Sequence, residues 1–123
     1  FYTPSHTRTD TLSEAPTTPY ARPRTQVPLY VLVDGGTGSA AESFAYTLQS
    51  AKRATVVGER SAGAANPGAM IDIGNGFSVF VSDGTPINPI TRANWEGTGI
   101  APDVAAASAD ALDAALRLAR RPR

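Results

Sequence analysis

Ser39 is the residue of this sequence best placed to do chemistry. It follows a short apolar run and a glycine-rich turn and opens a helical pattern, so its hydroxyl would lie beside the free N–H groups of a helix N-terminus. Such groups can stabilise an oxyanion, and hydrolase nucleophiles occupy turns of this kind. The segment Ser39-Ala40-Ala41-Glu42 also matches a capping box, in which the serine hydroxyl only satisfies a backbone amide. The residues alone leave both interpretations open.

Glu96 is the second candidate for chemistry. It lies in a loop directly after Trp95, the only tryptophan, where burial would suit a glutamate to proton transfer or charge stabilisation. A solvated glutamate without a role is the ordinary alternative. The only histidine, His6, lies in a polar segment, and its surroundings do not mark it as a base.

The elements around Ser39 predict a strand–turn–helix–strand unit. Residues 29–33 are continuously apolar, as expected of a strand buried on both faces, and Gly35 and Gly36 end the run. Apolar side chains then recur at helical spacing between residues 41 and 51. Residues 54–57 predict the second strand of the unit.

The flanking regions predict an arm, a hairpin and a final helix. Residues 1–28 are dense in threonine and proline, which favours an extended arm or linker, and residues 29–121 would form the folded core. Residues 69–73 and 77–81 alternate in strand fashion around an Asn-Gly turn, which predicts a hairpin. The stretches 60–68 and 83–102 are loop-rich, and residues 111–119 predict an amphipathic helix with Ser108 as its N-cap.

Composition narrows the class of protein. The chain has 123 residues, zero formal net charge and no cysteine. Zero net charge favours neither nucleic acid nor an anionic membrane surface as a partner, and the missing thiols exclude disulfides and thiolate metal sites. No apolar run approaches the roughly 20 residues of a membrane-spanning helix. The first residue is Phe1, so we expect a fragment or a processed chain.

Three segments in this order and spacing resemble the C-terminal part of the S41 serine peptidases. They are YVLVDGGTGSAAESFAYTLQ, KRATVVGERSAGAANPG and INPITRANWEGTGIAPDV. The family includes the tail-specific (C-terminal processing) proteases, the tricorn core protease and the repeats of interphotoreceptor retinoid-binding protein. The resemblance implies an α/β fold, namely the C-terminal half of a ClpP/crotonase-like ββα spiral.

The resemblance also implies catalytic roles. Tail-specific proteases pair their serine with a lysine after the second strand, and that position here is Ala64. The tricorn branch is closer in its T-x-S-A-A-E-x-F-A-Y and W-E-G segments, which implies Ser39 as the nucleophile and Glu96 as the charge-relay acid. The N–H of Ala40 would supply one oxyanion donor. The histidine base would come from outside this chain, and no metal or organic cofactor is implied.

The expected function is therefore peptide-bond hydrolysis by a serine peptidase whose machinery is incomplete in this chain. The partners would be a peptide or protein substrate and the missing N-terminal part of the same enzyme or another subunit, with a homo-oligomer left open. A bacterial periplasmic or extracellular location is expected, and the cytoplasm is not excluded. One alternative is a binding module for retinoids or fatty acids, with an apolar cleft near Phe44, Phe80 and Trp95. Another is a purely structural fragment.

Overall fold

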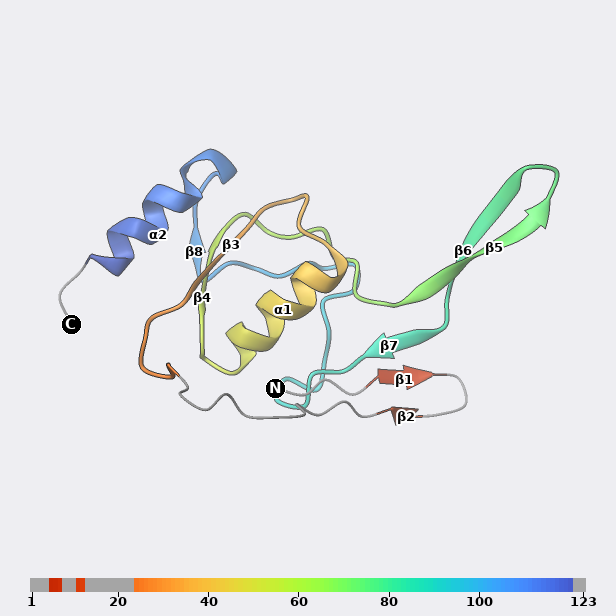
Figure 1. Cartoon of the computed structure of the whole chain (residues 1–123), viewed down its shortest axis with the longest axis horizontal. Helices are drawn as coiled ribbons and strands as arrows, with labels where there is room; N and C mark the ends of the chain where they lie inside the picture. Colours follow the sequence, from red (N-terminus) through yellow and green to blue (C-terminus); the bar gives the residue numbers. More distant parts are fainter. Residues whose placement is uncertain (1–4, 8–10, 13–23, 121–123) are drawn as a thin grey trace.

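A three-stranded parallel sheet and one helix form the centre of the molecule. The computed structural model describes residues 5–7, 11–12 and 24–120. Its central sheet has the order β3 (Tyr30–Val33), β4 (Thr55–Gly58), β8 (Val104–Ala105). Helix α1 (Ser39–Ser50) connects β3 to β4 and packs beside them (Figure 1). The predicted strand–turn–helix–strand unit is confirmed.

The core lies between the sheet, α1 and the loop that contains the tryptophan. Its buried members are Val33, Ala45, Val56, Trp95 and Ile100. Strand β4 is largely buried, but β3 is not covered on both faces as the sequence predicts, since 43% of Leu32 is exposed. Leu32 faces a cavity of about 250 Å³ that it shares with Leu112, because the C-terminal helix lies across this face without filling it.

That C-terminal helix, α2 (Ala111–Ala119), follows a short 3-10 turn, η1 (Ser108–Asp110). Ala111 and Ala115 are its buried residues. The prediction that Ser108 caps the helix is wrong, because its hydroxyl instead donates to Asp34 Oδ2 at 3.0 Å. This contact ties the start of the C-terminal helix to the turn that precedes Ser39.

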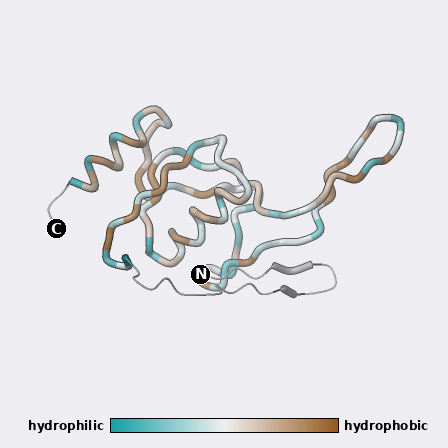
Figure 2. The backbone as a smooth tube through the Cα atoms, viewed as in Figure 1, coloured by the Kyte–Doolittle hydropathy of each residue, from teal (hydrophilic) through white to brown (hydrophobic). Residues whose placement is uncertain are grey.

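The predicted hairpin is present and projects away from the rest of the molecule (Figure 1). Strands β5 (Gly68–Gly74) and β6 (Phe77–Ser82) pair in antiparallel fashion, and every residue of both is exposed. Asn75 adopts a φ of 55° at the tip, as an Asn-Gly turn requires. Figure 2 shows hydrophobic stretches on both strands of this exposed hairpin as well as on β3 and β4.

A second small sheet was not predicted. It joins β1 (Ser5–Thr7), β2 (Thr11–Leu12) and β7 (Gly84–Pro86) in the order β2-β1-β7. The backbone of His6 is paired with that of Thr85. Segments expected to be an arm and a loop therefore contain strands that pair with each other, while the division of the chain at residue 28 stays a prediction.

Candidate active site

The turn before Ser39 is shaped by Asp34. The Asp34 carboxylate accepts a hydrogen bond from the Gly36 amide at 2.9 Å, and the Asp34 amide donates to the Thr37 hydroxyl at 3.0 Å. Hydrogen bonds from the Ser108 hydroxyl and the Gly36 amide lower the pKa of Asp34 below its usual value. The turn thus delivers the chain from β3 to the first residue of α1 in one defined conformation.

Ser39 is the first residue of α1 and has a left-handed backbone conformation, with a φ of 52°. Gly38, and not Ser39, is the N-cap, and no side chain at that position caps the helix. The Ser39 hydroxyl makes no hydrogen bond to any residue that the structure describes, so of the two interpretations of this serine the capping role is excluded. An exposed serine in a strained strand-to-helix turn is the arrangement that exposes the hydroxyl of a hydrolase nucleophile.

The other half of the capping box is present. Glu42 Oε2 accepts a hydrogen bond from the Ser39 amide at 2.9 Å. The Ala40 amide, next along the helix, has no acceptor within residues 24–120. A free amide directly after an unpaired serine hydroxyl is the donor that a tetrahedral oxyanion would require.

Glu42 is completely buried, and the sequence did not indicate it as a site residue. Besides the Ser39 amide, it accepts hydrogen bonds from Ser61 Oγ at 2.5 Å, Gly63 N at 2.7 Å and Ala64 N at 2.9 Å. Burial alone would raise the pKa of Glu42, but these hydrogen bonds outweigh it and lower the pKa. The glutamate of the S-x-x-E motif was the available signal, since a capping-box glutamate reaches back to the helix start.

Glu96 lies in the loop after Trp95, but the two side chains differ in their surroundings. Trp95 is 2% exposed and packs against Tyr46 with ring centroids 5.0 Å apart, whereas Glu96 is exposed. Of the two alternatives for Glu96, the buried one is therefore excluded, because its side chain leaves the core and reaches a neighbouring loop. Its Oε2 accepts hydrogen bonds from Ala65 N at 2.7 Å and Asn66 N at 2.8 Å.

The two glutamates meet the same loop. Glu42 accepts hydrogen bonds from the amides of Gly63 and Ala64, and Glu96 accepts them from Ala65 and Asn66. Four consecutive N–H groups therefore donate to two carboxylates. The structure does not join Ser39 to Glu96 by a hydrogen bond within the part of the chain it describes. It connects them through this loop.

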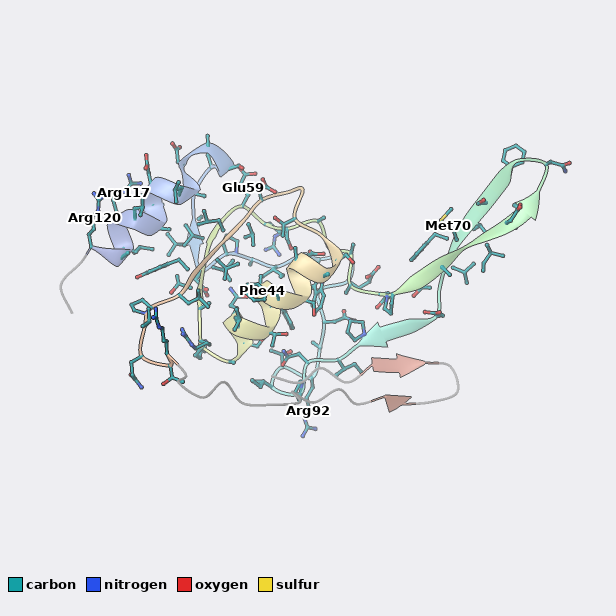
Figure 3. The ribbon with its side chains drawn as sticks, in the orientation of Figure 1. Phe44, Glu59, Met70, Arg92, Arg117 and Arg120 are labelled. Carbon is teal, nitrogen blue, oxygen red and sulfur yellow. The ribbon has the colours of Figure 1, made fainter. Side chains whose placement is uncertain are left out.

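Ser39 opens onto a small cavity of about 200 Å³. The lining includes Ala40, which the sequence predicted as an oxyanion donor, and its other members are mostly small or apolar: Ser43, Ala65, Pro67, Pro86 and Trp95. The apolar cleft expected near Phe44, Phe80 and Trp95 is wrong in two of its three residues, because Phe44 and Phe80 are 58% and 56% exposed and do not line this cavity. Figure 3 shows Phe44 on α1, well apart from Met70 on the hairpin.

Residues 5–7, 11–12 and 24–120 contain no group of three or more histidine, aspartate or glutamate side chains that could hold a metal ion. Over the same ranges, neither helix has the length and apolar character needed to cross a bilayer.

Comparison with known proteins gives consistent matches. The model of Peptidase family S41 matches residues 2–106. The carboxy-terminal-processing protease of Bartonella bacilliformis is 32% identical over 77 residues, which are 63% of this chain and 18% of that protein. This chain therefore spans less than a fifth of the length of that relative.

Solved structures agree with these sequence matches. The photosystem II D1 C-terminal processing protease superposes with a TM-score of 0.55 at 33% identity, over 66% of this chain and 21% of that one. Mature CPAF in complex with lactacystin has a TM-score of 0.67 at 23% identity, over 81% of this chain and 22% of that one, which supports the fold alone. The predicted α/β class is confirmed.

Proposed function

Because the chain belongs to Peptidase family S41, we propose that it is the nucleophile-bearing part of a serine peptidase that hydrolyses peptide bonds. The observation that carries this proposal is the state of Ser39. Its hydroxyl is unpaired and exposed, its backbone is strained with a φ of 52°, and it opens onto a cavity beside the free amide of Ala40. A serine used only as a cap would have its hydroxyl bonded to a helix amide.

The proposed chemistry begins with attack by Ser39 Oγ on the carbonyl carbon of the scissile peptide. The proton of Ser39 passes to a histidine base from outside this chain, and the negative charge that forms on the carbonyl oxygen is held by the Ala40 N–H and a second donor. The base then donates its proton to the leaving amine, which leaves an acyl-serine that water hydrolyses. An unactivated serine is a poor nucleophile, so this external base is essential to the proposal.

Glu96 fits the role of the acid that orients this base. Its Oε2 is fixed by two amides, while its Oε1 accepts no hydrogen bond from any described residue. An incoming imidazole N–H would find a carboxylate oxygen that is exposed and already oriented. The positive charge that the imidazole gains during attack would be stabilised by the same carboxylate.

The same family membership supports the wider setting that we propose. The parallel order β3-β4-β8 with α1 between β3 and β4 fits the C-terminal half of a ClpP/crotonase-like ββα spiral. The expected partners are a peptide or protein substrate and the remaining part of the enzyme, and self-association stays open. A periplasmic or extracellular location remains the expectation for a processing protease.

The alternative, a module that binds retinoids or fatty acids, has less support. The cavity at Ser39 is only about 200 Å³, whereas pockets for drug-sized ligands are typically about 300–1,000 Å³. The large aromatic side chains expected to line an apolar cleft lie outside it. The geometry therefore favours a small site for chemistry.

The test is peptide hydrolysis by the complete protein that carries this chain. Ser39→Ala should reduce kcat by several powers of ten, as loss of a nucleophile does. Ser43→Ala is the matched control, because Ser43 lines the same cavity one helical turn further on and has no proposed role. Activity that survives Ser39→Ala, or that falls as far in Ser43→Ala, would remove Ser39 as the nucleophile.

A further inference from the structure

Glu42 is a charged side chain with no exposed surface, and it contacts the proposed nucleophile directly. Both of its oxygens accept from the loop that follows Ser61, but only Oε2 also reaches the start of α1. Oε2 accepts from the amides of Ser39 and Ala64, both at 2.9 Å, and Oε1 accepts from Ser61 Oγ and the Gly63 amide. Each oxygen therefore has two donors, and the carboxylate is fully satisfied although it is buried.

The bond to Ser39 fixes the direction of that residue's amide. A φ of 52° is rare for an L-residue other than asparagine or aspartate, and it persists only where the surroundings impose it. The Glu42 carboxylate helps to impose it, since Oε2 accepts a hydrogen bond from the Ser39 N–H at 2.9 Å. The Ser39 amide is thereby unavailable to a substrate, and the Ala40 amide is left free.

We propose that Glu42 is a positioning residue for catalysis. It accepts the hydrogen bond of the Ser39 N–H and so orients the start of α1 with the Ala40 N–H free to bind the oxyanion. This inference rests on the proposed function, because it gives Glu42 a role only if Ser39 is the nucleophile. It requires that the hydrogen bond between Oε2 and the Ser39 N–H carries the catalytic effect. The contacts of Oε1, like that of Oε2 with the Ala64 amide, hold the loop and should matter mainly for folding.

A substitution at Ser61 allows the effects of the two Glu42 oxygens to be measured separately, because Ser61 contacts Oε1 alone. Its hydroxyl donates to Glu42 Oε1 at 2.5 Å and accepts from the Ile100 amide at 2.7 Å, so Ser61→Ala disturbs the buried network on the Oε1 side only. Glu42→Gln places an NH₂ group against donors whichever way the amide turns, because all four partners of the carboxylate are donors. A rotation that spares Oε1 would place the NH₂ group against the Ser39 amide.

The experiment compares kcat and KM of these variants in the complete protein, each normalised to the folded fraction measured by circular dichroism at the assay temperature. We expect Glu42→Gln to lower kcat by roughly 10²-fold with little change in KM, as a displacement of about 1 Å at a reacting group can do. Ser61→Ala should keep kcat within about threefold of the wild type once the folded fraction is corrected. Glu59→Gln, another glutamate that accepts a backbone amide but is exposed, should change neither constant.

Equal losses of kcat in Glu42→Gln and Ser61→Ala, or a wild-type kcat in Glu42→Gln, would overturn the positioning role. Where Glu42→Gln does not fold, Glu42→Asp replaces it, because aspartate keeps the charge but is one methylene too short to reach both sets of donors. The same outcomes then apply. Ser39→Ala separates this inference from its premise: an active Ser39→Ala protein refutes the proposed function, whereas an inactive one beside a fully active Glu42→Gln protein refutes only the role of Glu42.

Discussion

Replacing Ser39 with glycine should increase the free energy of unfolding while it removes the attacking hydroxyl. The left-handed conformation costs an L-residue roughly 1–2 kcal/mol, and glycine adopts it freely. Against this gain stands the greater freedom of glycine in the unfolded chain, about 0.5–1 kcal/mol. Ser39 is exposed and its hydroxyl caps no amide, so little else is lost. The expected net gain is about 0.5–1 kcal/mol.

The assay is urea denaturation of the complete protein followed by circular dichroism, with the peptidase rate measured on the same samples. Arg92→Gly is the matched control, because Arg92 has a φ of 55° and is exposed at a turn on the surface (Figure 3). Both variants should have higher urea midpoints than the wild type at an unchanged slope. Only Ser39→Gly should lose activity.

The sign of the stability change tests independently whether the Ser39 hydroxyl caps the helix. If the hydroxyl capped the helix, Ser39→Gly would lose a few tenths of a kcal/mol and Ser39→Ala about 0.5–2 kcal/mol. A lower urea midpoint for Ser39→Gly, with a raised midpoint for Arg92→Gly, would therefore refute the argument that strain is stored at the nucleophile.

Three further predictions concern Glu42, Glu96 and the central strand residue Gly58. The pKa of Glu42 is lowered in the folded state, so its stabilising effect is present above the ordinary glutamate value of about 4.3 and is lost as the pH falls through the lowered pKa. In acid unfolding followed by circular dichroism, the free energy of unfolding of Glu42→Gln should therefore fall less steeply over this pH range than that of the wild type, and equal slopes would contradict this. Glu96→Gln should lower kcat while its urea midpoint stays close to that of the wild type, since its side chain is exposed, and a wild-type kcat would remove Glu96 as the relay acid. Gly58→Ala should cost at least about 3 kcal/mol in urea denaturation, because Gly58 has a φ of 134° and an added Cβ would collide with the Val33 carbonyl oxygen in the adjacent strand; a midpoint within error of the wild type would contradict this.

The sequence predicted the parts of the fold that depend on neighbouring residues. The unit from β3 to β4 and the hairpin around Asn75 were both evident, because apolar spacing and turn residues are local signals. The sheet of β1, β2 and β7 was missed. Its pairing brings residues 5–7 beside residues 84–86, and neither segment alternates strongly enough to be identified alone.

The candidate site was predicted in its residues but not in its contacts. Ser39 was identified from its place between a turn and a helix, yet its free hydroxyl depends on a φ that no residue type dictates. Glu96 was identified beside Trp95, but the sequence left its burial open, because adjacent side chains in a loop point in different directions. The burial of Glu42 depends on Ser61 and on the loop that follows it, which lie about 20 residues further along the chain.

The two glutamates show how one residue type serves two purposes at this site. Each accepts hydrogen bonds from a pair of adjacent amides in the loop 63–66. Both oxygens of Glu42 are buried and paired, whereas Glu96 is exposed and Oε1 accepts from no described residue. A carboxylate without exposed surface cannot meet a base that arrives from elsewhere, so it can act on Ser39 only by holding the backbone. A carboxylate anchored by one oxygen can meet such a base and needs no burial for its orientation. The loop between them sets both positions at once, which places the fixed backbone of Ser39 and the exposed charge of Glu96 on either side of the same four amides.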